Sequence, residues 1–90
     1  MLSDQEERLV NTMHVLGDQN RYKMFKLLVS GKDMCVTEIA DTLGVSVPAA
    51  SQHFRIFELV GLVDKKRHGQ KICYGLKTDD PFVIKLINLV

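Results

Sequence analysis

The stretch TEIADTLGVSVPAASQHFRIF, residues 37–57, predicts two short helices separated by a glycine-containing turn. Thr37 is a suitable N-cap for the first helix, and Gly44 ends it. Ser46 caps the second helix, which has a proline in its first turn, where the missing N–H costs nothing, and continues to about Val60. Two helices joined by so short a turn indicate a helix-turn-helix, the motif that places its second helix in the major groove of DNA.

The second of these helices has an apolar side and a polar side. Ala50, Phe54 and Phe57 recur at helical spacing, so we expect them to face the protein core. The residues that this turns outward are Val47, Ser51, Gln52 and Arg55. Hydroxyl and amide groups can read base edges, and an arginine can reach guanine or a phosphate. Because a helical hairpin can also pack without binding anything, this pattern alone leaves a purely structural role open.

A basic hairpin follows the two helices. Residues 62–67 and 71–76 are strand-like runs joined by a short loop that contains a glycine. Between residues 61 and 78 five lysines and arginines stand against one aspartate, a local net charge of +4, whereas the first ten residues carry a net charge of −2. Such a hairpin would lie beside the phosphate backbone and bind it without regard to sequence. The side chains expected there are Lys65, Lys66, Arg67, His68 and Lys71.

The remaining sequence predicts three more helices. They extend from the cap Ser3 to Gly17, from the cap Asp18 to the residue before Gly31, and from Asp80-Pro81 to the end of the chain. No repeat or linker divides the chain, so residues 1–90 are expected to form a single domain. Helices, then a hairpin, then one helix predict an α+β, mostly α, winged helix-turn-helix domain with about five helices and a two-stranded wing hairpin.

Several classes of function are disfavoured by the sequence. The first ten residues are acidic and lack the apolar stretch of a secretory signal, which indicates a cytoplasmic protein. The apolar run at residues 82–90 is too short to span a bilayer, so we expect no membrane role. No serine or cysteine stands with a histidine and a carboxylate in an arrangement typical of catalysis, and no glycine-rich phosphate loop occurs. We therefore expect the protein not to be an enzyme.

The sequence resembles the ArsR/SmtB family of winged-helix repressors over nearly the whole chain, and three segments carry the resemblance. LGDQNRYKMFKLL at residues 16–28 looks like the family's second-helix signature, and VSVPAASQHF at residues 45–54 is similar to its recognition helix. GLV at residues 61–63, followed by a basic hairpin that ends in YGL at residues 74–76, resembles its wing. The resemblance implies an effector-responsive repressor that binds an inverted-repeat operator on double-stranded DNA as a homodimer.

The resemblance also implies site residues. The DNA-contacting positions of the family fall on Ser46, Val47, Pro48, Ser51, Gln52 and His53, with Arg55 and the wing cations as backbone contacts. The first and last helices would form the dimer interface, through Leu9, Met13, Phe82, Val83, Leu86, Ile87 and Val90. Independently, residues 82–90 are apolar around most of the helix and need cover on more than one side, although a core helix of a monomer is the alternative.

The nature of any effector is less well defined. Many relatives sense metals through a Cys-Val-Cys box, but here the box is Cys35-Val36-Thr37, and thiolate metal sites need several sulfur ligands. The last helix contains no histidine for the family's other zinc site. We therefore predict no cofactor, while a metal ion at Cys35 with ligands from the other subunit stays an alternative.

The two cysteines allow two further interpretations. Cys35 and Cys73 could form a thiol sensor, as in some relatives, although Cys73 lies in the second wing strand rather than in the final helix that those sensors use. Alternatively, both are unpaired, small, buried apolar residues. Two other functions also stay open, a repressor without an effector and a winged-helix module that binds a partner protein through its hairpin and last helix.

Overall fold

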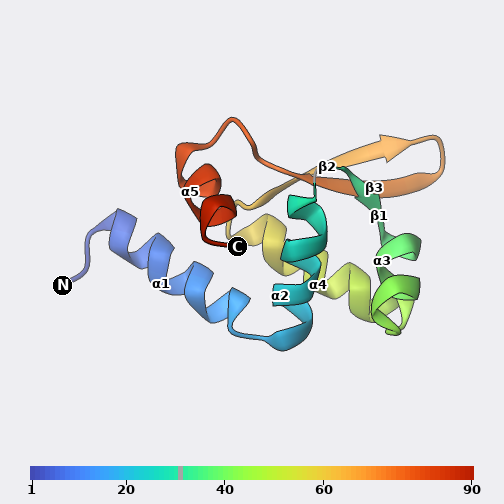
Figure 1. The fold of residues 1–90 in the computed structure, drawn as a ribbon, viewed down its shortest axis with the longest axis horizontal. Coiled ribbons are helices and arrows are strands. Elements are labelled where there is room, and N and C mark those ends of the chain that lie inside the picture. Colours follow the sequence, from blue (N-terminus) through green and yellow to red (C-terminus); the bar gives the residue numbers. More distant parts are fainter. Residues whose placement is uncertain (31) are drawn as a thin grey trace.

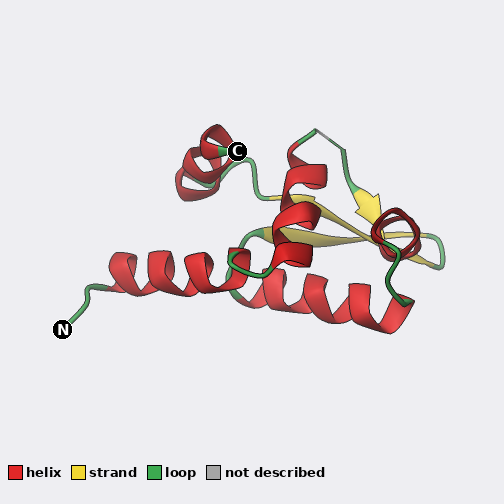
Figure 2. Cartoon of the chain, turned by 60° about the horizontal axis from the view of Figure 1, so that its bottom comes forward, coloured by secondary structure: helices red, strands yellow, loops and turns green. Residues whose placement is uncertain are grey.

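The protein is a winged helix-turn-helix domain, as its sequence predicts. The computed structural model describes residues 1–30 and 32–90. The described residues form five helices and a three-stranded antiparallel sheet (Figures 1 and 2). In chain order the elements are α1 (Asp4–Leu16), α2 (Gln19–Val29), β1 (Met34–Cys35), α3 (Val36–Leu43), α4 (Val47–Leu59), β2 (Val63–His68), β3 (Lys71–Leu76) and α5 (Pro81–Leu89). None of these helices combines the length and the apolar character needed to cross a membrane.

Polar caps begin four of the five helices, as predicted. The side chains that accept a first-turn backbone N–H are Ser3, Asp18, Ser46 and Asp80. The prediction for α3 was wrong, because its N-cap is Cys35 rather than Thr37. Cys35 already lies in an extended strand, and its N–H donates to Glu38 Oε1 at 2.8 Å, so the helix begins at the next residue. The predicted stop at Gly31 lies outside the described residues.

The wing is a regular hairpin. Strands β2 and β3 pair from Val63 with Leu76 to His68 with Lys71, and Gly69 begins the two-residue turn with a φ of +65°, which favours glycine. A third strand, β1, was not predicted. It pairs with β3, placing Cys35 opposite Cys73, and the strand order is β1-β3-β2.

The core fixes α4 against both the other helices and the sheet. Ala50, Phe54 and Phe57 are fully buried, which confirms the predicted inward face of α4. The Phe54 ring stacks on that of Tyr74 in β3, with centroids 4.3 Å apart and planes 9° from parallel. Phe57 meets Phe25 of α2 edge to face at 6.5 Å. The outer side of α4 is therefore held in a fixed position relative to the wing.

Helices α1 and α5 lie at the end of the molecule away from the wing, and α1 extends from the body (Figure 2). Within the chain, α1 packs mainly on α2. Arg8 joins it to the rest, because its Nη2 donates to Asp80 Oδ2 at 2.7 Å and to the carbonyl oxygen of Gly61 at 3.2 Å. The same guanidinium lies 4.2 Å from the centroid of the Phe82 ring.

Candidate nucleic-acid interface

The outer side of α4 presents the polar residues that the sequence predicts. Ser46, Pro48, Gln52 and Arg55 are exposed, and so is Val47, while Ser51 is half-buried. Ser46 Oγ accepts the N–H of Ala49, but its hydroxyl hydrogen stays free to donate. Beside the exposed Val47 and Pro48, the arrangement presents hydroxyl, amide and guanidinium groups, which suit the edges of bases and the phosphates beside them.

His53 occupies a different position. Each helical residue turns by about 100°, so His53 lies on the flank of α4, beside the core residues rather than beside Gln52. Its side chain is half-buried, and Nδ1 is sheltered from solvent without a hydrogen-bond partner among the described residues. The pKa of Asp18 lies below its ordinary value, chiefly because the backbone N–H of Arg21 donates to its carboxylate, and the nearby His53 adds to this effect. Because its half-buried side chain offers less surface to a nucleic acid than the exposed Gln52 does, the interface proposed below does not include His53.

The predicted wing cations all lie exposed on the hairpin, but they are not equivalent. Lys66 Nζ lies 3.0 Å from Asp33 Oδ2, in the segment that leads into β1. Lys65, Arg67 and Lys71 form no ion pair within residues 1–30 and 32–90. The sequence gives no sign of the Asp33–Lys66 contact, because the two residues are 33 positions apart and neither lies in a recognisable motif.

A shallow pocket of about 280 Å³ marks the place where the helix-turn-helix meets the wing. It is lined by Cys35, Val36, Thr37, Val47, Ser51, Gln70, Lys71 and Ile72. Its walls come from the beginnings of α3, α4 and β3 and from Gln70 in the wing turn, so the outer side of α4 and the tip of the wing border one continuous surface. A nucleic acid lying on α4 would therefore also lie beside the wing.

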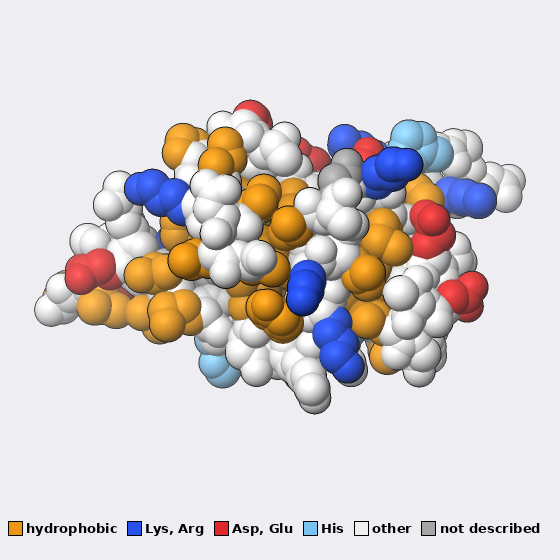
Figure 3. Space-filling model, in the orientation of Figure 1, with side chains coloured by type: hydrophobic (Ala, Val, Ile, Leu, Met, Phe, Trp, Pro, Cys, Tyr) orange, Lys and Arg blue, Asp and Glu red, His pale blue; other side chains and the backbone are white. Residues whose placement is uncertain are grey.

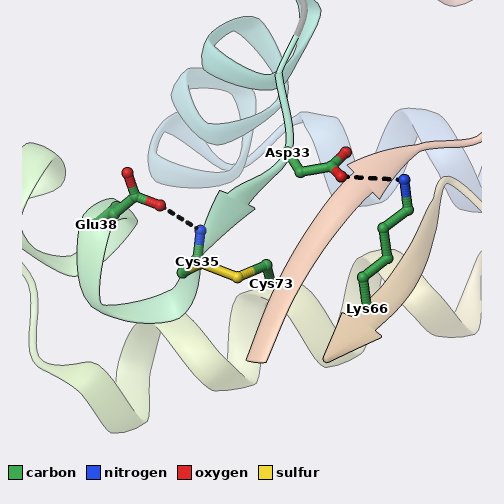
Figure 4. Close-up of a disulfide and its surroundings, with 5 residues drawn as sticks. All are labelled: Asp33, Cys35, Glu38, Lys66 and Cys73. Carbon is green, nitrogen blue, oxygen red and sulfur yellow. Dashed lines mark hydrogen bonds and ion pairs between the residues drawn. A yellow bond between two sulfur atoms is a disulfide. The ribbon is translucent and has the colours of Figure 1, made fainter. Parts of the chain in front are cut away.

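Cys35 and Cys73 form a disulfide across the β1–β3 ladder (Figure 4). The interpretation of both cysteines as unpaired residues was therefore wrong for this structure. The disulfide also occupies the sulfur that a metal ion at Cys35 would need. Within the described part of the chain, no group of three or more His, Cys, Asp or Glu side chains is arranged to hold a metal ion.

An apolar surface covers α1 and α5 at the opposite end (Figure 3). Between these helices lies a groove of about 310 Å³, lined by Thr12, Met13, Leu16, Gly17, Tyr22, Leu86, Leu89 and Val90. The hydroxyl of Thr12 is buried there without a hydrogen-bond partner among the described residues. Such a surface is typical of proteins that bury it against a second subunit.

The predicted dimer residues divide into two groups. Leu9, Met13 and Val90 are exposed, and Phe82 and Ile87 are half-buried, so these five can contact a second subunit. Val83 is fully buried within the single chain and holds α5 on its own core, whereas Leu86, which is 8% exposed, lines the groove. Sequence reasoning missed the exposed Val10 and Leu89 on the same surface. For Val10 the available signal was the helical period of α1, which places it on the same side as Met13. For Leu89 there was no such signal, because α5 is apolar on nearly all sides.

The Arg8–Asp80 ion pair makes the free energy of unfolding depend on pH. The hydrogen bond from Arg8 lowers the pKa of Asp80 from its ordinary value, and the N–H of Phe82 lowers it further. A carboxylate with a lowered folded-state pKa stabilises the fold above its unfolded pKa and loses this contribution as the pH falls through the folded value. We expect Asp80→Asn, which keeps an N-cap side chain, to reduce the free energy of unfolding at neutral pH, with the difference from wild type shrinking as the pH falls through the lowered folded-state pKa.

Urea unfolding at fixed protein concentration, repeated from pH 7 to pH 3, measures this difference. Asp79→Asn is the matched control, because Asp79 is an exposed neighbour without an ion pair among the described residues. A difference between Asp80→Asn and wild type that persists unchanged at the acid end would contradict the assignment to the ion pair.

Known proteins share both the sequence and the fold. The family model described as "Bacterial regulatory protein, arsR family" matches residues 18–65. The cadmium resistance transcriptional regulatory protein CadC of Listeria innocua is 33% identical over 76 residues, which are 84% of this chain and 60% of CadC. The transcriptional repressor SdpR of Bacillus subtilis is 34% identical over 68 residues, 76% of this chain and 74% of SdpR. The chain thus spans about three fifths of the length of CadC.

Solved structures agree on the fold. HlyU from Vibrio cholerae superposes with a TM-score of 0.85 at 23% identity, covering 98% of this chain and 92% of HlyU. A homodimeric winged helix-turn-helix DNA-binding domain from Mycobacterium bovis gives a TM-score of 0.79 at 24% identity, covering 99% and 83%. The family consists of transcriptional regulators and not of enzymes. Its model covers the helix-turn-helix and the start of the wing, and we conclude that the chain belongs to the arsR family of bacterial regulatory proteins.

Proposed function

We propose that the protein is a transcriptional repressor that binds duplex DNA as a homodimer and works in the cytoplasm, where that DNA lies. The observation that carries this proposal is the continuous surface formed by the outer side of α4 and the tip of the cationic wing. The relatives CadC and SdpR are named as transcriptional regulators, which supports the same activity. Repression follows when the bound dimer covers promoter DNA.

Sequence would be read by α4 and affinity supplied by the wing. Gln52 lies at the centre of the outer side of α4, where its amide can donate to and accept from a base edge. Lys65, Arg67 and Lys71 can neutralise phosphates, each adding about 0.9 to the slope of log affinity against log salt. The remaining proposed contacts of α4 are Ser46, Val47, Pro48, Ser51 and Arg55.

The apolar surface on α1 and α5 would hold the second subunit. A twofold axis through this surface would place one α4 in each of two successive major grooves, about 34 Å apart. The operator would then be an inverted repeat. The M. bovis domain, described as homodimeric, has the same fold and supports this arrangement.

Gln52→Ala and Lys65→Ala should weaken DNA binding in different ways. We expect Gln52→Ala to change the preferred sequence and to cost about 1–3 kcal/mol on the best site, because a base-specific contact is lost. Lys65→Ala should weaken binding to all sequences alike and lower the salt slope by about one unit for each lysine lost. Binding-site selection and fluorescence anisotropy across a salt series measure the two effects.

Lys26→Ala is the control for charge alone, because Lys26 is an exposed cation of α2, outside α4 and the wing. An unchanged sequence preference for Gln52→Ala would remove Gln52 from base reading. If the affinity measured across the salt series does not fall as the salt concentration rises, the result would favour a protein partner over DNA. An apolar contact with a protein depends little on ionic strength, whereas contacts with phosphates depend on it strongly.

A further inference from the structure

The disulfide joins the two halves of the proposed DNA-binding surface. Cys35 directly precedes α3, the first helix of the helix-turn-helix, and Cys73 lies in the middle of the wing strand β3. Strand β1 is only two residues long, so its hydrogen bonds to β3 form a very short ladder. The covalent bond is therefore the strongest link between this segment and the wing.

The segment linked by the disulfide also places Asp33 beside a wing cation. It lies two residues before Cys35, and its side chain crosses β3 to Lys66 on β2 (Figure 4). The crossing passes over Gly75, where the Cβ of any other residue would collide with the Asp33 carboxylate. The missing side chain at Gly75 thus leaves the room that the Asp33–Lys66 contact needs.

The ion pair alone is too weak to keep Asp33 in place. The Lys66 and Asp33 side chains retain 48% and 37% of their exposure, and an ion pair so open to solvent contributes at most about 1 kcal/mol. The disulfide keeps the carboxylate beside Lys66 as a tether does, by raising its local concentration. Without it, the two-residue ladder and the packing of the half-buried Met34 against the core oppose release of the segment.

We propose that Cys35 and Cys73 are a reversible redox pair that controls how many cations the wing offers to DNA. In the oxidised protein Asp33 neutralises Lys66, and the wing has one phosphate contact fewer per subunit. In the reduced protein β1 separates from β3, Asp33 leaves Lys66, and DNA binds more tightly. The proposal rests on the DNA binding proposed above, and it agrees with the rule that disulfides of cytoplasmic proteins are usually redox-sensing.

The two sulfur atoms differ in access, which sets the route of each reaction. Cys35 is half-buried and lines the open pocket, whereas Cys73 is buried. A thiolate of a dithiol reductant would attack Cys35 Sγ, the S–S bond would break, and Cys73 would leave as a thiolate and take up a proton. The reductant's second thiolate then attacks its own sulfur in the mixed disulfide, which frees Cys35 and leaves the reductant oxidised.

Hydrogen peroxide would supply the oxidation. The Cys35 thiolate attacks one peroxide oxygen, the O–O bond breaks, and a sulfenic acid and water form. The Cys73 thiolate then attacks the sulfur of the sulfenic acid, the S–S bond forms and a second water leaves. Two thiols and one peroxide thus give one disulfide and two waters.

The test compares DNA binding by the full chain after dithiothreitol and after hydrogen peroxide, with each redox state verified by its mass and by thiol counting. For a dimer on an operator-length duplex, we expect severalfold tighter binding by the reduced form and a salt slope steeper by about 1.8, two phosphates at 0.9 each. Asp33→Asn should bind equally tightly in both states. Cys73→Ser should bind DNA with the affinity of the reduced wild type, and hydrogen peroxide should not change that affinity.

Asp64→Asn is the matched control, because Asp64 is another exposed acid paired with a lysine, Lys77 at 3.5 Å, but lies outside the disulfide-linked segment. It should shift both redox states equally and keep the difference between them. Equal binding by the two states of the wild type, or a redox difference that survives in Asp33→Asn, would overturn the proposal while leaving DNA binding intact. If neither state binds any duplex at low salt, the proposed function fails and the redox proposal falls with it.

Discussion

Replacing Met13 with lysine is expected to convert the dimer into monomers and to lower operator affinity by about 10²–10⁴-fold. Met13 lies on the α1 side of the apolar groove and is 63% exposed in the single chain, so water can solvate the new ammonium in a monomer. In a dimer the charge would be buried in the apolar interface, and the twofold axis would bring a second like charge close to it. A monomer retains only one recognition helix and one wing per duplex.

Light scattering after size exclusion measures the assembly, and anisotropy on full and half operators measures the binding. Leu59→Lys is the control, because Leu59 is 80% exposed and lies near α1 beside Asp4 and Glu7, outside the groove that Met13 lines. If Leu59→Lys dissociates the dimer and Met13→Lys does not, the interface lies elsewhere.

Phe54→Ala should have the largest effect on stability, about 3–5 kcal/mol. The Phe54 ring is fully buried and stacks on Tyr74, so alanine would leave a cavity between α4 and β3 that the surrounding backbone cannot close. Domains of this kind have a total stability of about 5–15 kcal/mol, so the loss is a large share of it. We also expect weaker DNA binding, because α4 and the wing lose their shared support.

Chemical denaturation followed by circular dichroism, at a fixed protein concentration, gives the change in free energy. Arg55→Ala is the neighbouring control, since Arg55 is exposed and its removal should leave stability nearly unchanged while weakening DNA binding. A loss below about 1 kcal/mol for Phe54→Ala would contradict the packing described for the core.

Local chemistry explains why most of the fold could be predicted from the sequence. Ser3, Asp18, Ser46 and Asp80 accept first-turn N–H groups in the structure, and such caps depend only on neighbouring residues. The inward face of α4 follows from its period in the same way. The exposed contacts of α4 then follow, because they lie opposite its buried residues. The wing strands do not alternate in this way, since Cys73, Tyr74 and Gly75 are buried in succession.

Contacts between distant parts of the chain could not be predicted. Strand β1 is too short to show alternation, and it exists because Cys35 pairs with a residue 38 positions later. The same pairing moved the start of α3 away from Thr37 and brought Asp33 to Lys66. Because α5 is apolar on nearly all sides, its sequence does not show which side faces the core. Val83 could therefore not be distinguished from residues of α5 that face outward.

The weak attachment of α1 affects how the regulator persists in a cell. Because this helix rests mainly on α2 and on the bonds of one arginine, we expect α1 to be more open to proteolysis in a newly made chain that has not yet formed the proposed dimer. Scarce chains would be cleared before they pair, whereas abundant ones protect each other. The supply of active regulator would thus rise more steeply than its rate of synthesis.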